Sequence, residues 1–304
     1  MISLRMSRFL VAALAAIPAC VSPPPPAVTA TPAASTAAAP SSVTLAAAPD
    51  RYFTSADARI RYRDVGQGPP VVLIHGLGRS LDDWFGLGDS LARDHRVIAL
   101  DIRGFGKSTR IKDQSRLGLE MAGDVVRVLD QLGISRAHLA GHSMGAAIAA
   151  KIAAVHPDRV LSVGLVAGPF FGDSTAFARD EGGFAATVER TGSMITLVKW
   201  LFPSYPDSVQ VAMNAQTMAM NDPATVAAAM RSMDALVVTP NVASVVRAPA
   251  VVLVGGGDPL APQSRWLASW WPNARLVEVA SADHFTILLQ PETLAAMRAL
   301  IAGS

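Results

Sequence analysis

The sequence predicts an α/β protein with a doubly wound, mostly parallel sheet and a helical cap inserted after the sixth strand. Near-continuous apolar runs recur along the chain, which is typical of parallel strands covered on both faces. Amphipathic stretches separate most of these runs, and such alternation of strands and helices favours a doubly wound sheet. One interval of about eighty residues, between 167 and 250, interrupts the alternation and contains no clear strand.

The predicted elements begin with an antiparallel hairpin over 51–65, where polar and apolar residues alternate until the segment GQGPP. Apolar runs then predict the parallel strands, at 71–74, 97–100, 137–140, 161–167, 250–254 and 276–279. Amphipathic patterns predict the core helices, at 81–93, 117–132, 146–156, 262–271 and 291–301. The core is therefore expected to comprise 51–168 and 246–304.

The interval 169–245 is expected to form a helical cap over the carboxyl ends of the strands. It carries six of the eleven methionines and several aromatic side chains. Methionine fills ordinary cores, but it also suits adaptable ligand surfaces. Both a packing role and a binding role for these residues stay open.

The first nineteen residues resemble a bacterial signal peptide. Arg5 and Arg8 precede a short apolar run that is too short to span a bilayer. Cys20 is the single cysteine of the chain, and the segment IPAC resembles the lipobox of bacterial lipoproteins, whose cysteine is lipidated. We expect an exported protein tethered to the cell envelope through Cys20, in the outer membrane of a Gram-negative host; a soluble periplasmic or secreted protein is the alternative.

Residues 20–50 are expected to form a disordered tether. Between Val21 and Pro49, 25 of 29 residues are Pro, Ala, Ser or Thr and none is charged, so the segment has little to bury against its conformational entropy. Without residues 1–19 the chain has 24 basic and 24 acidic residues, which gives no support for nucleic-acid binding. A single cysteine excludes an internal disulfide and a multi-cysteine metal site, and we expect neither a metal nor a cofactor.

The first candidate catalytic residue is Ser143, which lies in the segment LAGHSMGAAIAA between a predicted strand and a predicted helix. Gly141 and Gly145 would let the two backbones pass in a tight turn, and GHSMG fits the nucleophile-elbow pattern GxSxG. A serine needs a base, and the base needs an acid. His284 and Asp258 each follow a predicted strand, so they are expected on the same sheet edge as Ser143.

Residues 51–304 resemble the α/β hydrolase family. The resemblance is carried by the elbow, by LIHGLG at 73–78 and by DIRGFGKS at 101–108. It implies Ser143 as nucleophile, His284 as base and Asp258 as acid. Asp173 is the runner-up for the acid, because some family members place it after the sixth strand.

The resemblance also implies the remaining groups of the site. The backbone amides of Leu77 and Met144 would form the oxyanion hole. His75 and Gly76 would support its loop. His142 is expected to be a packing or hydrogen-bonding residue rather than the base, since the elbow geometry would point it the wrong way, and Asp283 is expected to cap its loop.

The predicted function is a cofactor-free serine hydrolase that cleaves a carboxylic ester of a small to medium apolar molecule through an acyl-enzyme. A serine nucleophile argues against family members with a carboxylate nucleophile, such as haloalkane dehalogenases and epoxide hydrolases. Hydrolysis of carbon–carbon bonds in ring-cleavage products, lactone opening and perhydrolysis stay open on the same triad. A ligand-binding protein on a hydrolase scaffold is the alternative of another class.

Overall fold

A computed structural model describes residues 43–172 and 174–304 of the chain, without the side chains of 174–181. The predicted signal peptide, Cys20 with its predicted lipid, residues 20–42 of the tether and Asp173 lie outside the described residues. Within them, no helix is long and apolar enough to cross a membrane.

The core is one eight-stranded sheet in the order β1-β2-β4-β3-β5-β6-β7-β8. The first two strands form the predicted hairpin, and β2 continues antiparallel beside β4; all other pairs are parallel. The strands are β1 (Arg51–Ser55), β2 (Ala58–Val65), β3 (Pro70–Ile74), β4 (Arg96–Leu100), β5 (Ala137–His142), β6 (Val160–Val166), β7 (Ala250–Gly255) and β8 (Ala274–Val279).

Helices cover both faces of the sheet, as the alternating pattern predicts. One apolar cluster joins a face of the sheet to α1 (Phe85–Leu91) and α10 (Pro291–Ala302). The cluster on the other face includes α2 (Leu119–Gln131), α3 (Met144–Val155) and α9 (Ala261–Trp270). Short 3-10 helices lie at Leu81–Trp84, Gln114–Arg116, Pro157–Arg159, Met233–Leu236 and Thr286–Leu289.

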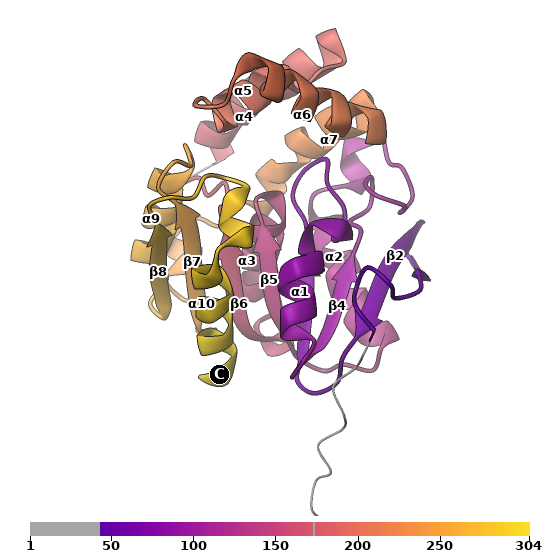
Figure 1. The fold of residues 1–304 in the computed structure, drawn as a ribbon, viewed down its shortest axis with the longest axis vertical. Coiled ribbons are helices and arrows are strands. Elements are labelled where there is room, and N and C mark those ends of the chain that lie inside the picture. The colour runs from indigo at the N-terminus through magenta and orange to yellow at the C-terminus, as the bar shows by residue number, and fades with distance from the viewer. Residues whose placement is uncertain (1–42, 173) are drawn as a thin grey trace, which may run out of the picture. The chain divides into compact units, whose positions relative to one another are not determined.

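The cap predicted after the sixth strand is helical. It lies over one end of the sheet (Figure 1). Its helices are α4 (Ser174–Thr191), α5 (Ile195–Leu201), α6 (Asp207–Met220), α7 (Pro223–Ser232) and α8 (Pro240–Ala243).

Two details of the prediction were wrong. The ordered core begins before residue 50, because Leu45 is fully buried against α1 and its backbone amide donates to Asp89 at 2.6 Å. The composition of 43–50 did not indicate that Leu45 and Ala48 are buried. Strand β8 is not covered on both faces, since it is the edge of the sheet and Leu276 is 38% exposed.

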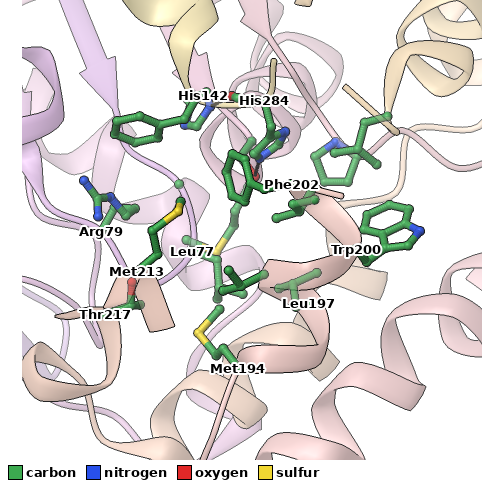
Figure 2. Close-up of a pocket in the computed structure, with 18 of the residues that line it drawn as sticks. Leu77, Arg79, His142, Met194, Leu197, Trp200, Phe202, Met213, Thr217 and His284 are labelled. Carbon is green, nitrogen blue, oxygen red and sulfur yellow. Dashed lines mark hydrogen bonds between the residues drawn. The ribbon is translucent and has the colours of Figure 1, made fainter. Parts of the chain in front are cut away.

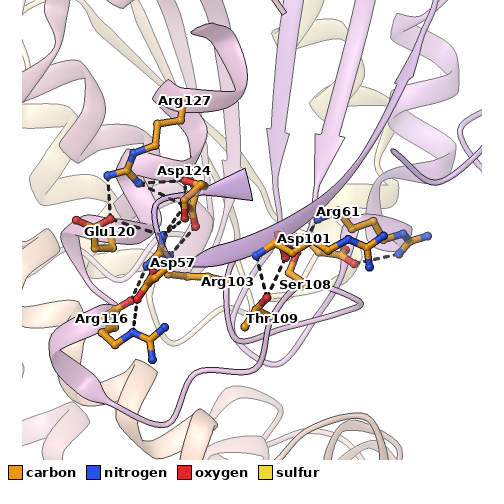
Figure 3. A network of polar contacts seen from close by, with 12 residues as sticks. Asp57, Arg61, Asp101, Arg103, Ser108, Thr109, Arg116, Glu120, Asp124 and Arg127 are labelled. Atoms are coloured by element: carbon orange, nitrogen blue, oxygen red, sulfur yellow. Dashed lines mark hydrogen bonds and ion pairs between the residues drawn. The ribbon is translucent and has the colours of Figure 1, made fainter. Parts of the chain in front are cut away.

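A buried ionic network ties the hairpin to the segment after β4 (Figure 3). Arg103 and Asp124 are both fully buried and form two hydrogen bonds of 2.7 Å. Asp124 also accepts from the hydroxyl of Ser55 at 2.5 Å, and Arg103 donates to the backbone oxygen of Arg116 at 3.0 Å. The DxRGxGxS resemblance therefore includes a structural arginine that joins β1, α2 and the loop after β4.

We expect Asp124→Leu to lower the free energy of unfolding by about 3–5 kcal/mol, because it leaves the Arg103 guanidinium buried without its partner. Urea denaturation measures the change. Asp130→Leu is the matched control: it removes the more exposed ion pair with Arg159, and a change of at most about 1 kcal/mol is expected. Equal losses in the two variants would contradict the assigned role of the buried pair.

Candidate active site

Ser143 occupies a strained turn between β5 and α3. Its φ of 52° and ψ of −122° lie where residues with a Cβ atom are rare. The backbone amide of Ser143 donates to the carbonyl oxygen of Val166 at 2.9 Å, which ties the turn to β6. A Cβ atom at Gly141 would lie 2.1 Å from the carbonyl oxygen of Gly145, so the small residues of the motif are sterically required.

The three residues predicted as a triad lie together. His284 Nε2 is 3.1 Å from Ser143 Oγ, and His284 Nδ1 is 2.9 Å from Asp258 Oδ2. His284 and Asp258 are buried, with 4% of each residue exposed. The serine hydroxyl can donate to Nε2 while Nδ1–H donates to the carboxylate, so one tautomer of His284 satisfies both contacts.

Close packing of two loops holds the acid beside the base. Gly255, at the end of β7, leaves no room for a side chain: a Cβ atom there would lie 2.4 Å from the carbonyl oxygen of Ala282. The other carboxylate oxygen of Asp258 accepts from the backbone amide of Leu260 at 2.9 Å. Each carboxylate oxygen of Asp258 thereby has a hydrogen-bond partner, which fixes the orientation of the acid toward His284.

Loop 73–78 brings a second set of groups to Ser143. His75 is fully buried; its Nδ1–H donates to Gly76 O at 2.7 Å and its Nε2 accepts from the amide of Ile102 at 3.0 Å. Burial lowers the pKa of His75, so the ring stays neutral in this tautomer. A Cβ atom at Gly76 would lie 3.1 Å from the Cβ of Ser143, so the loop approaches the nucleophile closely. Leu77 and Met144 both line the cavity beside Ser143.

His142 contacts the backbone of the candidate base. Its Nε2–H donates to the carbonyl oxygen of His284 at 2.8 Å, and the two rings lie 5.1 Å apart. Burial, with a smaller effect of the neighbouring His284, lowers the pKa of His142 to about 4. The ring is therefore a neutral donor, and its Nδ1 has no hydrogen-bond partner in the described part of the chain.

A largely apolar cavity of about 260 Å³ opens between Ser143 and the cap (Figure 2). The sequence did not single out individual cap residues for this role; their apolar character was the available signal. Cap residues supply just over half of the lining: Pro169, Met194, Leu197, Val198, Trp200, Leu201, Phe202, Met213, Gln216, Thr217 and Met233. The core supplies Gly76, Leu77, Arg79, His142, Ser143, Met144, Leu260, His284 and Phe285.

The other titratable groups near the site have partners elsewhere. Asp283 does not contact the ring of His284: one of its oxygens accepts from the amides of Phe285 and Thr286 at 2.9 and 2.8 Å. His138, near the start of β5 and so at the opposite end of the strand from Ser143, lies 2.8 Å from Ser162 Oγ. Among residues 43–172 and 174–304, no group of three His, Cys, Asp or Glu side chains could hold a metal ion.

Residues 69–199 match the family model of the alpha/beta hydrolase fold. The chain is 42% identical over 146 residues to a dihydrolipoyllysine-residue acetyltransferase component of the acetoin cleaving system from Cupriavidus necator, covering 48% of this chain and 39% of that protein. It is 38% identical over 115 residues to a 2-hydroxy-6-oxo-6-phenylhexa-2,4-dienoate hydrolase from Burkholderia cepacia, covering 36% of this chain and 40% of that one. The matched part of the chain thus covers about 40% of the length of each of these relatives.

Solved structures match over a longer stretch. An enol-lactonase from Burkholderia xenovorans superposes with a TM-score of 0.69 at 25% identity, covering 83% of this chain and 98% of that one. A thermophilic esterase from Thermogutta terrifontis superposes with a TM-score of 0.70 at 25% identity, covering 84% of this chain and 99% of that one. The family match, these superpositions and the mostly parallel sheet together identify the chain as an α/β hydrolase in fold.

Proposed function

We propose that this protein is a serine hydrolase that cleaves a carboxylic ester through an acyl-enzyme. The observation that carries the proposal is the hydrogen-bonded series from Ser143 through His284 to Asp258, in which Ser143 and His284 line the cavity. Its order and contacts are those that nucleophilic acyl transfer requires.

In the acylation step, Ser143 Oγ attacks the carbonyl carbon while its proton moves to His284 Nε2. Asp258 stabilises the imidazolium through the Nδ1–H hydrogen bond. The amides of Leu77 and Met144, which donate to no other group of the described chain, would donate hydrogen bonds to the carbonyl oxygen as negative charge develops on it. When this tetrahedral intermediate collapses, its bond to the alcohol oxygen breaks and the alcohol leaves with the proton from His284. The acyl group stays on Ser143 Oγ.

In the second step, a water molecule takes the place of the alcohol. His284 removes one of its protons as the water oxygen attacks the acyl carbon, and the same two amides hold the oxyanion again. The carboxylic acid leaves, and the proton returns to Ser143 Oγ. The cycle uses Ser143, His284, Asp258, the two backbone amides and one water molecule.

The lining favours an uncharged, apolar substrate of small to medium size. Leu197, Val198 and Phe202 present hydrocarbon to the cavity, and burying a substrate chain against them is favourable. Arg79 is a charged lining residue, but its guanidinium forms hydrogen bonds of 2.5–3.1 Å with both carboxylate oxygens of Asp83. Among the described lining residues, the cavity therefore offers no unpaired cation to a carboxylate on the substrate.

Carbon–carbon bond hydrolysis and lactone opening could use the same triad. Similar proteins support these two reactions, whereas the residues that line the cavity do not favour them specifically. One relative hydrolyses a 2-hydroxy-6-oxo-6-phenylhexa-2,4-dienoate, and one structural neighbour is an enol-lactonase. A panel of chromogenic esters of graded acyl length, with a lactone and a vinylogous diketone, separates ester, lactone and carbon–carbon hydrolysis. Absence of turnover across the panel would favour a ligand-binding protein on the same scaffold.

Replacing Ser143 by alanine is expected to abolish turnover with the fold intact, because it removes one oxygen from a turn already built for small residues. Loss of a nucleophile costs about a millionfold in the turnover number of the subtilisin triad. The measurement is kcat on 4-nitrophenyl butyrate, with circular dichroism as the check on folding. Retention of a tenth of the activity would rule out Ser143 as the nucleophile.

His142 offers a second test, because glutamine and asparagine can imitate different nitrogen atoms of its ring. The amide nitrogen of glutamine can reach the carbonyl oxygen of His284, as Nε2 does, whereas that of the shorter asparagine cannot. We expect kcat within about threefold of wild type for His142→Gln and a loss of about tenfold for His142→Asn. Equal rates of ester hydrolysis in the two variants would show that the hydrogen bond to His284 does not matter.

A further inference from the structure

Helix α6 of the cap forms part of the cavity wall, and the residues that flank its two ends form hydrogen bonds with the loops that carry the candidate catalytic groups. Its middle supplies Met213 and Thr217 to the cavity wall, where Figure 2 labels both. Tyr205 lies just before the helix and Asn221 just after it. Each of these two side chains forms a hydrogen bond with the core.

At the first end, the hydroxyl of Tyr205 donates to Asp283 Oδ2 at 2.6 Å. Asp283 directly precedes His284, and its other oxygen holds the backbone amides that follow. Phe202 strengthens this end: its ring centroid lies 5.3 Å from that of Tyr205 and 6.2 Å from that of His284. A shift of this end of the helix would therefore be transmitted to the loop of the base.

At the second end, the side-chain amide of Asn221 donates to the carbonyl oxygen of Gly78 at 2.8 Å. Gly78 directly follows Leu77, whose amide is assigned to the oxyanion hole. Arg110 fixes Asn221 from the other side, by donating to Asn221 Oδ1 at 3.2 Å. A Cβ atom at Gly78 would lie 2.9 Å from Thr217 Cγ2, so α6 rests directly on this loop.

We propose that Tyr205 and Asn221 are positioning residues that make α6 a strap between the base and the oxyanion hole. The proposal rests on the serine-hydrolase function. A substrate that packs against the middle of the helix would hold both ends in place, so contact with the cap is converted into alignment of His284 and the Leu77 amide. Binding energy from a remote part of the substrate then contributes to kcat.

The test uses Tyr205→Phe, Asn221→Leu and the double variant in the full chain. We expect each single change to lower kcat on 4-nitrophenyl butyrate about fivefold, with a smaller change in KM. Loss of either hydrogen bond already breaks the connection between the two loops, so the second loss should add little. The kcat of the double variant should therefore be close to that of the slower single variant, and not about 25-fold below wild type. Assays are run well below each variant's Tm, so that loss of folding does not contribute.

Lys112→Met is the matched control. It removes another contact between core and cap, the 2.8 Å ion pair with Asp222, without touching either loop of the site. Single variants that behave like this control, or a double variant whose losses multiply, would overturn the strap.

A second readout separates this inference from the proposed function. The rate at which a fluorophosphonate labels Ser143 also depends on the base and the oxyanion hole, and it should show the same pattern in the variants. If wild type hydrolyses no ester, the proposed function fails and the labelling rates still decide whether the strap exists. If wild type hydrolyses esters and both readouts follow Lys112→Met, only the strap fails.

Discussion

The strained turn at Ser143 is the constraint on which the site depends. A positive φ at a serine is unfavourable by itself, and it persists because β5, β6 and α3 hold the backbone on both sides. The turn has no space for larger neighbours: a Cβ atom at Gly145 would lie 2.1 Å from the carbonyl oxygen of Ile74. The same close approach brings loop 73–78 against the nucleophile, so one packing constraint sets both the hydroxyl and the adjacent amides.

Polar groups around the turn are held by contacts that leave them few alternatives. His75 is fixed in one tautomer by two backbone groups, and His142 donates to the backbone of His284 while staying neutral. One carboxylate oxygen of Asp258 accepts a hydrogen bond from His284, and the other accepts one from the backbone amide of Leu260. Such prior ordering lowers the reorganisation needed when charge develops in the transition state. The cap side chains that line the cavity beside these groups are mostly apolar, so they offer few competing hydrogen bonds.

Sequence reasoning could predict that Ser143, His284 and Asp258 lie close together because the signals for their positions are local. A buried run followed by GHSMG predicts a strand, a turn and a helix, and the ends of parallel strands meet at one edge, which brings Asp258 and His284 toward Ser143. The hydrogen bonds between the cap and the core could not be predicted from the sequence. Nothing in the sequence near Tyr205 or Asn221 indicates a bond to Asp283 or Gly78, since those pairs depend on how separate helices pack. The burial of Leu45 was missed for the same reason.

Formation of a covalent intermediate on Ser143 tests the central claim most directly. A carbamate ester such as 4-nitrophenyl dimethylcarbamate transfers a group that leaves the serine slowly, so the intermediate can be isolated. The account predicts release of one equivalent of 4-nitrophenolate and one dimethylcarbamoyl group on the peptide that contains Ser143, as found by mass spectrometry. An adduct on a different residue, or an unmodified protein after prolonged incubation, would contradict it.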